Sequence, residues 1–296
     1  MREHDVFAAD GTRIRVWQTD NEGPVVLLSP GLGTVPEAWP ALLLPSCGVR
    51  VISWYHRGTM GSARPDDESR IELADHVSDA LTVLDDAGVE ECVVLGWSMG
   101  VTVAAELALR HSHRVSGLLL AAGTPGDSFE GMLPVPGLPP ELRRLFSLTG
   151  TKVLRAAGPL LDLVLHHAAP ATAVLPADMA KATRRFLLHD WRWYFTLALA
   201  LGRAPRLDLT GVTCPTTLLA GKYDVLAAPQ SMTAPAGPLP QARVRVLPTS
   251  HFLPLEAPEV VAEELLLLID RVDAVHRALY DIDPPAPLTS GSRRRA

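Results

Sequence analysis

The sequence contains little cysteine and no long uninterrupted apolar run. Its three cysteines, Cys47, Cys92 and Cys214, are isolated and form no CxxC pair. This pattern argues against a disulfide framework and against a zinc site. No apolar run approaches the roughly 18 residues that a membrane helix needs, and residues 1–16 lack the apolar region of a signal peptide. We therefore expect a soluble, cytoplasmic protein with no membrane span, no bound metal and no organic cofactor.

The chain also lacks a strong charge of either sign. Its formal net charge is −6 over 296 residues, so the charge does not predict a nucleic-acid partner. The tail at 281–296 includes the basic run RRR but has no apolar periodicity, and we expect it to be a disordered, solvated end. The length suits one large domain, or one domain with an insertion. The sequence leaves the oligomeric state open.

Short apolar runs alternate with helical patterns through much of the chain. The turn signal Asp10-Gly11 predicts strands on either side of it, at 4–8 and 13–19. The runs predict strands at 24–29, 50–54, 91–96, 114–121, 214–221 and 242–247. Between them, apolar residues recur at helical spacing at 69–87, 99–111 and 257–279. Alternation of this kind predicts an α/β fold with a parallel sheet and right-handed crossovers.

The alternation stops after Gly123. Residues 124–140 are dense in proline and glycine, which opposes regular structure, and residues 141–202 are mostly helical in pattern. We therefore expect an α/β core that is interrupted by a helical cap. The predicted division is core at 1–126, cap at 127–207, core again at 208–280 and the disordered tail at 281–296.

A single hydroxyl stands between two glycines at the junction of a predicted strand and a predicted helix. The stretch Gly96-Trp97-Ser98-Met99-Gly100 matches the G-x-S-x-G pattern in a strand–turn–helix context. The glycines permit a sharp turn that exposes the Ser98 hydroxyl at the carboxyl edge of the sheet. We predict that Ser98 is a catalytic nucleophile. The alternative is a tight turn without chemistry.

A serine nucleophile requires a base, and the base requires an acid that orients it. His251 and Asp224 each follow a predicted strand, so both are expected at the same edge of the sheet as Ser98. The chain order Ser98, Asp224, His251 is the order expected for a nucleophile on such a turn. Asp127 is an alternative acid. The other histidines are interpreted as surface or insertion-packing residues, among them His56 and His76.

The oxyanion that develops during acyl transfer needs two backbone N–H donors. One is the amide of Met99, the residue after the predicted nucleophile. The second is expected from Pro30-Gly31-Leu32-Gly33, which follows a strand and suits a backbone that turns and presents amides. We predict the Leu32 amide as this second donor. An ordinary glycine turn is the alternative.

These residues resemble those of the α/β-hydrolase superfamily over about residues 4–280. The resemblance rests on SPGLGT at 29–34, WYHRGTMGS at 54–62, GWSMG at 96–100, AGKYD at 220–224 and SHFLPLEAPE at 250–259. It implies an eight-stranded, mostly parallel sheet with helices on both faces and a helical lid after the sixth strand. Relatives often have His-Gly at Pro30-Gly31, Asp-x-Arg-Gly at Tyr55-His56-Arg57-Gly58, and Gly at Ser250.

The function predicted from these residues is hydrolysis of an acyl bond by a serine enzyme. A carboxylic ester of a small, largely apolar molecule is the expected substrate, with carbon–carbon, amide or thioester hydrolysis as variants. Serine at the nucleophile position argues against the dehalogenase and epoxide-hydrolase branches, whose nucleophile is Asp. An acyltransferase, a cofactor-independent peroxidase-type enzyme and a non-catalytic ligand-binding protein stay open as alternatives. Four aromatic residues of the insertion either line an acyl pocket or pack the cap onto the core: Trp191, Trp193, Tyr194 and Phe195.

Overall fold

The computed structural model describes residues 1–132, 137–175, 177–237, 239 and 241–280. In these residues eight strands form one sheet in the order β1-β2-β4-β3-β5-β6-β7-β8. Strand β2 pairs antiparallel with β1 and β4, and the other pairs are parallel. The strands are β1 Arg2–Phe7, β2 Arg13–Gln18, β3 Val25–Ser29, β4 Arg50–Trp54, β5 Cys92–Trp97, β6 Val115–Ala121, β7 Thr216–Gly221 and β8 Ala242–Leu247.

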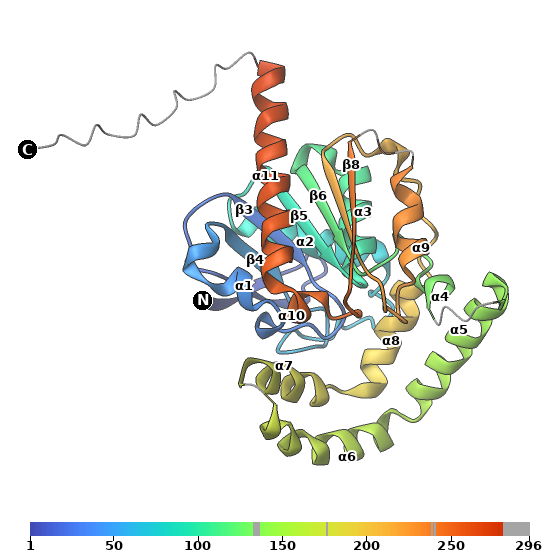
Figure 1. Cartoon of the computed structure of the whole chain (residues 1–296). Helices are drawn as coiled ribbons and strands as arrows, with labels where there is room; N and C mark the ends of the chain where they lie inside the picture. Colours follow the sequence, from blue (N-terminus) through green and yellow to red (C-terminus); the bar gives the residue numbers. More distant parts are fainter. Residues whose placement is uncertain (133–136, 176, 238, 240, 281–296) are drawn as a thin grey trace, which may run out of the picture.

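Helices cover both faces of this sheet (Figure 1). They are α1 Pro40–Leu43, α2 Leu73–Asp86, α3 Gly100–Arg110, α4 Ser128–Gly131, α5 Pro140–Ala156, α6 Gly158–Ala168, α7 Ala177–Leu187, α8 Trp191–Gly202, α9 Pro229–Thr233, α10 Leu253–Glu256 and α11 Pro258–Tyr280. Short 3-10 turns are η1 Pro36–Ala38, η2 Pro45–Cys47, η3 Ser112–Arg114, η4 Ala169–Val174, η5 Leu209–Gly211 and η6 Ala234–Ala236. The predicted fold class, an eight-stranded and mostly parallel α/β sheet with helices on both faces, is confirmed.

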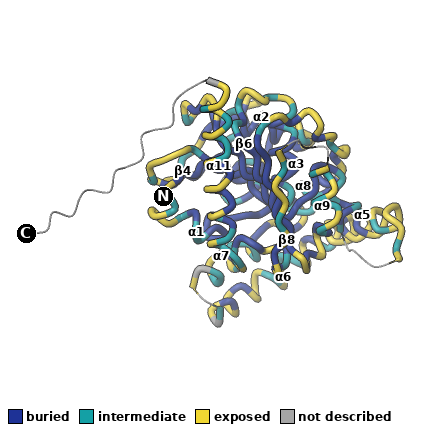
Figure 2. Tube along the Cα trace, turned by 45° about the horizontal axis from the view of Figure 1, so that its top comes forward, coloured by how far each residue is buried: buried dark blue, intermediate teal, exposed yellow. Residues whose placement is uncertain are grey.

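The central strands are apolar on both sides because both sides are covered. In β3, Val26 and Leu28 pack with α1 and α11, whereas Leu27 packs with α2 and α3 on the opposite face. All three side chains are fully buried. Figure 2 shows the strands in the buried colour at the centre of the molecule. This two-sided burial explains why the strands read as continuous apolar runs rather than as alternating ones.

The insertion follows the sixth strand, as expected. Helices α4 to α8 lie between β6 and β7 in the chain and gather together below the sheet (Figure 1). Helix α8 carries Trp193, Leu197 and Ala200, which form a buried cluster with Leu32 of the loop after β3. The insertion therefore packs onto the edge where that strand ends. The division into core at 1–126 and 208–280 and cap at 127–207 stays a prediction.

Some local features differ from the sequence expectation. The segment 36–47 forms α1 between two 3-10 turns, where no element was predicted, and α4 forms within the proline-rich stretch 124–140. The predicted disordered tail at 281–296 lies outside the described residues. No helix in the described part of the chain is long and apolar enough to cross a membrane. The cellular compartment stays a prediction.

Candidate active site

The turn between β5 and α3 places Ser98 in a backbone conformation that side chains rarely adopt. Its φ is +56°, in the left-handed region that disfavours non-glycine residues. The neighbouring glycines permit this turn: a Cβ on Gly96 would lie 2.7 Å from the Gly100 carbonyl oxygen, and a Cβ on Gly100 would overlap the Ser29 carbonyl oxygen. Strain retained at one serine between two obligatory glycines is typical of a functional turn.

Ser98, His251 and Asp224 form one hydrogen-bonded line. The Nε2 of His251 lies 2.8 Å from Ser98 Oγ, and its Nδ1 lies 2.8 Å from Asp224 Oδ2. Because the carboxylate accepts from Nδ1–H, the neutral ring presents the lone pair of Nε2 to the serine hydroxyl. His251 and Asp224 are both buried, and Ser98 is half-buried. The structure thus brings together three predicted residues that are far apart in the sequence.

The two oxygens of Asp224 have different partners. While Oδ2 contacts His251, Oδ1 accepts the backbone N–H groups of Leu226 and Ala227, each at 2.8 Å. These two bonds fix the carboxylate, so its second oxygen is held in place for the imidazole. The aspartate therefore shapes its own turn and orients the histidine at the same time.

The alternative acid, Asp127, lies elsewhere. It is the N-cap of α4, and its carboxylate accepts hydrogen bonds from Arg144 Nε, at 3.0 Å to each oxygen. This ion pair joins the start of the insertion to α5. The structure therefore places Asp224, and not Asp127, beside His251.

The predicted oxyanion donors have free amides. Within the described residues, the Leu32 and Met99 N–H groups donate to no carbonyl or side chain. The loop that carries Leu32 is closed by Thr34, whose amide and hydroxyl both donate to the Gly31 carbonyl oxygen, at 3.0 and 2.6 Å. Gly31 packs directly on Trp97, since a Cβ there would lie 2.5 Å from the indole ring. Leu32 is buried and Met99 is half-buried, and unpaired amides in such positions are uncommon. Their role as oxyanion donors stays a prediction.

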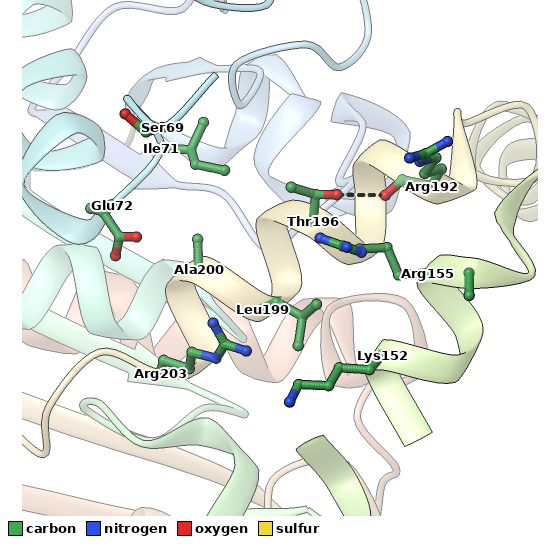
Figure 3. Close-up of a pocket in the computed structure, with 11 residues that line it drawn as sticks. Ser69, Ile71, Glu72, Lys152, Arg155, Arg192, Thr196, Leu199, Ala200 and Arg203 are labelled. Atoms are coloured by element: carbon green, nitrogen blue, oxygen red, sulfur yellow. Dashed lines mark hydrogen bonds between the residues drawn. The ribbon is translucent and has the colours of Figure 1, made fainter. Parts of the chain in front are cut away.

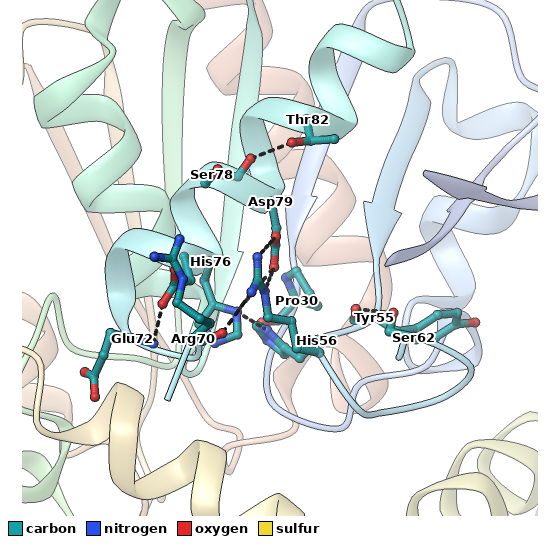
Figure 4. A network of polar contacts seen from close by, with 12 residues as sticks. Pro30, Tyr55, His56, Ser62, Arg70, Glu72, His76, Ser78, Asp79 and Thr82 are labelled. Carbon is teal, nitrogen blue, oxygen red and sulfur yellow. Dashed lines mark hydrogen bonds and ion pairs between the residues drawn. The ribbon is translucent and has the colours of Figure 1, made fainter. Parts of the chain in front are cut away.

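A buried histidine, which the sequence analysis missed, holds the same loop. His56 Nε2–H donates to the Pro30 carbonyl oxygen at 2.9 Å, and its Nδ1 lies 3.2 Å from Nδ1 of His76 on α2 (Figure 4). Burial lowers the pKa of His56 to about 4, against the opposing effect of the Pro30 hydrogen bond, and lowers the pKa of His76 as well. Both rings are therefore neutral near pH 7. The interpretation of these two histidines as surface or insertion-packing residues was wrong.

The departure at Tyr55-His56-Arg57-Gly58 thus has a structural reason. Arg57 is buried and makes a two-pronged ion pair with Asp79 of α2, at 2.8 and 2.7 Å. It also pairs with Asp10, and the Trp193 indole N–H donates to its carbonyl oxygen at 2.8 Å. This network anchors the loop after β4, from which His56 reaches Pro30 in the loop after β3.

An apolar cavity of about 430 Å³ is lined by the chain neighbours of Ser98 and His251, but by none of the three residues Ser98, His251 and Asp224 themselves. On the core side it is lined by Leu32, Trp97 and Phe252, which belong to or adjoin the predicted oxyanion, nucleophile and base positions. On the insertion side, Met179, Ala182 and Phe186 of α7 complete it. The cavity is large and apolar enough to hold an apolar group of a small molecule.

The four aromatic residues expected either to line a pocket or to pack the cap do not line this cavity. Trp191 stacks with Phe186, Tyr194 and Phe195 at centroid distances of 5.1–5.9 Å, and Trp193 bonds to the loop after β4. Trp193 belongs to the buried cluster that contains Leu32 of the core, and Tyr194 packs against that cluster. Trp191 and Phe195, in contrast, pack within the insertion. Periodicity could not distinguish the two roles, because both bury apolar rings.

The next question is whether side chains near this site could bind a metal ion. Among the residues that the structure describes, no group of three or more His, Cys, Asp or Glu side chains could hold a metal ion. Both ring nitrogens of His251 are engaged by Ser98 and Asp224. What the arrangement can do chemically is move a proton between the serine hydroxyl and the imidazole.

Comparison with known families agrees with this geometry. The model of the alpha/beta hydrolase fold family matches residues 24–258, and this chain belongs to that family. The match includes the loop after β3, the turn at Ser98, the insertion, and the loops that carry Asp224 and His251.

Similar proteins of known sequence are hydrolases. The chain is 27% identical over 277 residues to "Putative carbamate hydrolase RutD" of Azorhizobium caulinodans, covering 90% of this chain and 99% of that protein. It is 29% identical over 171 residues to the pimeloyl-[acyl-carrier protein] methyl ester esterase of Nitrosospira multiformis, covering 55% and 62%. It is 28% identical over 186 residues to epoxide hydrolase A of Mycobacterium tuberculosis, covering 60% and 52%.

Solved structures share the fold across nearly the whole chain. The enol-lactonase of Burkholderia xenovorans superposes with a TM-score of 0.70 at 21% identity, covering 90% of this chain and 100% of that one. A thermophilic esterase of Thermogutta terrifontis gives 0.69 at 22% identity, covering 92% and 99%. At these identities the likeness of the solved structures shows the fold alone. The sequence relatives named above are hydrolases, which supports a hydrolase.

Proposed function

We propose that this hydrolase cleaves an acyl bond, by preference a carboxylic ester of a small and largely apolar substrate, through an acyl-enzyme on Ser98. The observation that carries the proposal is the line from Ser98 Oγ through His251 to Asp224, with both contacts at 2.8 Å. A nucleophile, a base and an orienting acid at hydrogen-bond distance are what nucleophilic acyl transfer requires.

In the first half-reaction, Ser98 Oγ attacks the acyl carbonyl carbon while His251 Nε2 takes the hydroxyl proton. The carbonyl oxygen becomes an oxyanion, which the amides of Met99 and Leu32 stabilise. Asp224 stabilises the imidazolium that forms. The proton on Nε2 then passes to the leaving alcohol as the carbon–oxygen bond breaks, which leaves the acyl group on Ser98.

In the second half-reaction, water replaces the alcohol. His251 takes a proton from water as the hydroxide attacks the acyl carbon, and the same two amides hold the second oxyanion. When the intermediate collapses, Ser98 Oγ regains the proton from His251 and the carboxylic acid leaves. No step requires a group other than those named.

We assign the apolar cavity to the acyl group of the substrate. One wall of the cavity consists of core residues beside the oxyanion loop, and the other consists of residues of α7 in the insertion. The insertion therefore limits the length of the acyl group that fits. The relatives named as ester esterase and carbamate hydrolase support acyl chemistry. We do not propose the activity of the epoxide hydrolase relatives for this chain, because Ser98 occupies the nucleophile position where that branch has Asp.

A fluorophosphonate probe tests the proposal, because it reacts only with an activated serine. The wild type should be labelled, Ser98→Ala should not, and His251→Ala should be labelled far more slowly. A wild type inert both to the probe and to esters of short and long acyl chains would overturn the proposal and favour the non-catalytic binding protein. Added alcohol separates hydrolysis from acyl transfer: an acyltransferase would form a new ester in preference to the free acid.

A further inference from the structure

A second groove lies between α5, α8 and the loop before α2. Its volume is about 620 Å³, within the size range of small-molecule sites. Four cationic side chains line it: Lys152 and Arg155 from α5, Arg192 from α8, and Arg203 at the C-cap of α8 (Figure 3). Figure 3 shows Lys152 and Arg155 extending from α5 toward α8.

Helix periodicity explains why the lining residues of α8 share one face. Four of them are spaced four, three and four residues apart, which places these four in a row along the helix, and Ala200 stands beside the row. The row consists of Arg192, Thr196, Leu199 and Arg203. Cations therefore stand at both ends of the row, with a hydroxyl and an apolar side chain between them.

Close packing of the two helices brings the cations of α5 to this row. The buried residues of α5 are the small Ser147 and Thr151, which let the helix approach α8 closely. After α5 ends, Gly158 contacts α8 so tightly that a Cβ there would lie 2.5 Å from the backbone nitrogen of Arg192. Lys152 and Arg155 lie between these contacts, so the geometry of the groove is set by packing and not by the cations themselves.

None of the four cations has an anionic partner in the described residues. Elsewhere in the chain, Arg57, Arg114 and Arg243 each pair with a carboxylate. The one acidic lining residue is Glu72, the N-cap of α2, whose backbone N–H donates to Asp75 Oδ2 at 3.0 Å. Residues 127–207 hold ten Lys and Arg against six Asp and Glu, although the whole chain is acidic. Like charges gathered in one groove repel, and a bound anion removes that cost.

Helix dipoles account for only part of this arrangement. Arg155 in the last turn of α5 and Arg203 at the C-cap of α8 stand where a cation is favourable. Arg192 is the second residue of α8, at the helix end where a cation is unfavourable. The dipole therefore disfavours a cation at Arg192, whereas an anion in the groove would favour all four of these exposed cations.

We propose that this groove binds the phosphate groups of a small phosphorylated molecule. Arg192 and Arg155 offer planar donor pairs that match phosphate oxygens, and Lys152 and Arg203 add charge. The apolar part of the lining, Ile71 with residues of α8, suits the carbon part of such a ligand. The volume admits a molecule with a diphosphate or with two separate phosphates.

The groove is one layer of side chains away from the predicted oxyanion loop. Ile71 and Ala200 line it, and both belong to the buried cluster that contains Leu32 and against which Met99 packs. The phosphate can therefore belong either to the leaving group of the substrate or to a separate molecule that binds beside the active site. Binding of a phosphorylated molecule in this groove does not depend on the proposed hydrolase function.

Calorimetric titration with pyrophosphate tests the binding. The wild type and Ser98→Ala should both bind one pyrophosphate, and affinity should fall with salt. The double variant Arg155→Gln/Arg192→Gln should bind at least about tenfold more weakly, since each lost charge-assisted hydrogen bond is worth that much or more. The matched control is Arg184→Gln on α7, which removes an exposed cation outside the groove and should bind like the wild type.

Two results would overturn the proposal: a wild type that binds no pyrophosphate, or an equal loss of affinity in Arg184→Gln, which would indicate general attraction to the basic insertion. Hydrolysis assays then separate the sources of the phosphate. If it belongs to the substrate, the double variant loses kcat/KM for an ester with a phosphorylated leaving group and keeps it for a neutral ester. If it belongs to a separate molecule, both esters are hydrolysed by the variant as by the wild type while pyrophosphate binding is lost.

Discussion

Replacing His56 by glutamine should make the protein less sensitive to acid. Burial lowers the pKa of His56 from its ordinary value of 6.5 to about 4 in the folded protein. Between these two values the unfolded chain binds a proton that the folded protein does not, so the free energy of unfolding falls as pH falls. The loss begins near pH 6.5 and ends near pH 4. Glutamine does not titrate, but its Nε2 can still donate to the Pro30 carbonyl oxygen.

The size of the effect follows from the two pKa values. At about 1.4 kcal/mol per pH unit, the full contribution of His56 is about 3 kcal/mol. At pH 5 the linkage relation gives a loss of about 2 kcal/mol relative to pH 7.5. Groups that do not contact His56 contribute equally in both proteins. His76 contacts His56, and this contact helps to lower the pKa of His76, so the difference between the two proteins reports His56 together with its effect on His76.

Urea unfolding followed by circular dichroism at pH 7.5 and pH 5 measures this difference. The free energy of unfolding of His56→Gln should fall by about 2 kcal/mol less than that of the wild type. His113→Gln removes an exposed histidine and should follow the wild type. Equal losses in wild type and His56→Gln would refute the account of His56 as a buried, neutral support of the oxyanion loop.

Four further outcomes are expected. In urea unfolding, Ser98→Gly should be more stable than Ser98→Ala by about 0.5–1 kcal/mol, because alanine retains the strain of the positive φ. Gly100→Ala should lose about 1–3 kcal/mol of unfolding free energy in the same assay, because its Cβ overlaps the Ser29 carbonyl oxygen. Ala182→Phe should lower kcat/KM about tenfold or more for long acyl esters and leave acetyl esters unaffected. Steady-state kinetics of Asp224→Asn should show kcat reduced about 10⁴-fold, with Asp127→Asn close to the wild type.

The sequence was sufficient to predict those features whose structure is decided by a local pattern of residues. Continuous apolar runs identified the strands because both faces of the sheet are covered, and GWSMG identified the turn because each glycine faces a backbone atom that a Cβ would meet. Asp224 and His251 could be chosen because the ends of parallel strands lie at one edge. The contacts between these residues and Ser98 agree with that choice, while their catalytic roles stay predictions until measured.

Other features depend on packing that no local pattern contains. The prediction for His56 was wrong because its burial arises from α2 and the loop after β3, which are distant in the sequence. Phe186 lines the apolar cavity, whereas the nearby Trp191 packs against the Phe186 ring. Only the relative orientation of α7 and α8 decides which of the two side chains reaches the cavity. The cations of the groove are spread over two helices, so their convergence is visible only when α5 packs on α8.

The most direct test of the central claim is to find where the acyl group goes during turnover. A p-nitrophenyl ester mixed with the enzyme and quenched within the first turnovers should give a burst of p-nitrophenol close to the enzyme concentration. Peptide mapping of the quenched enzyme should place the acyl group on Ser98. Hydrolysis of the ester with no acyl group on Ser98, or with the acyl group on another residue, would contradict the account.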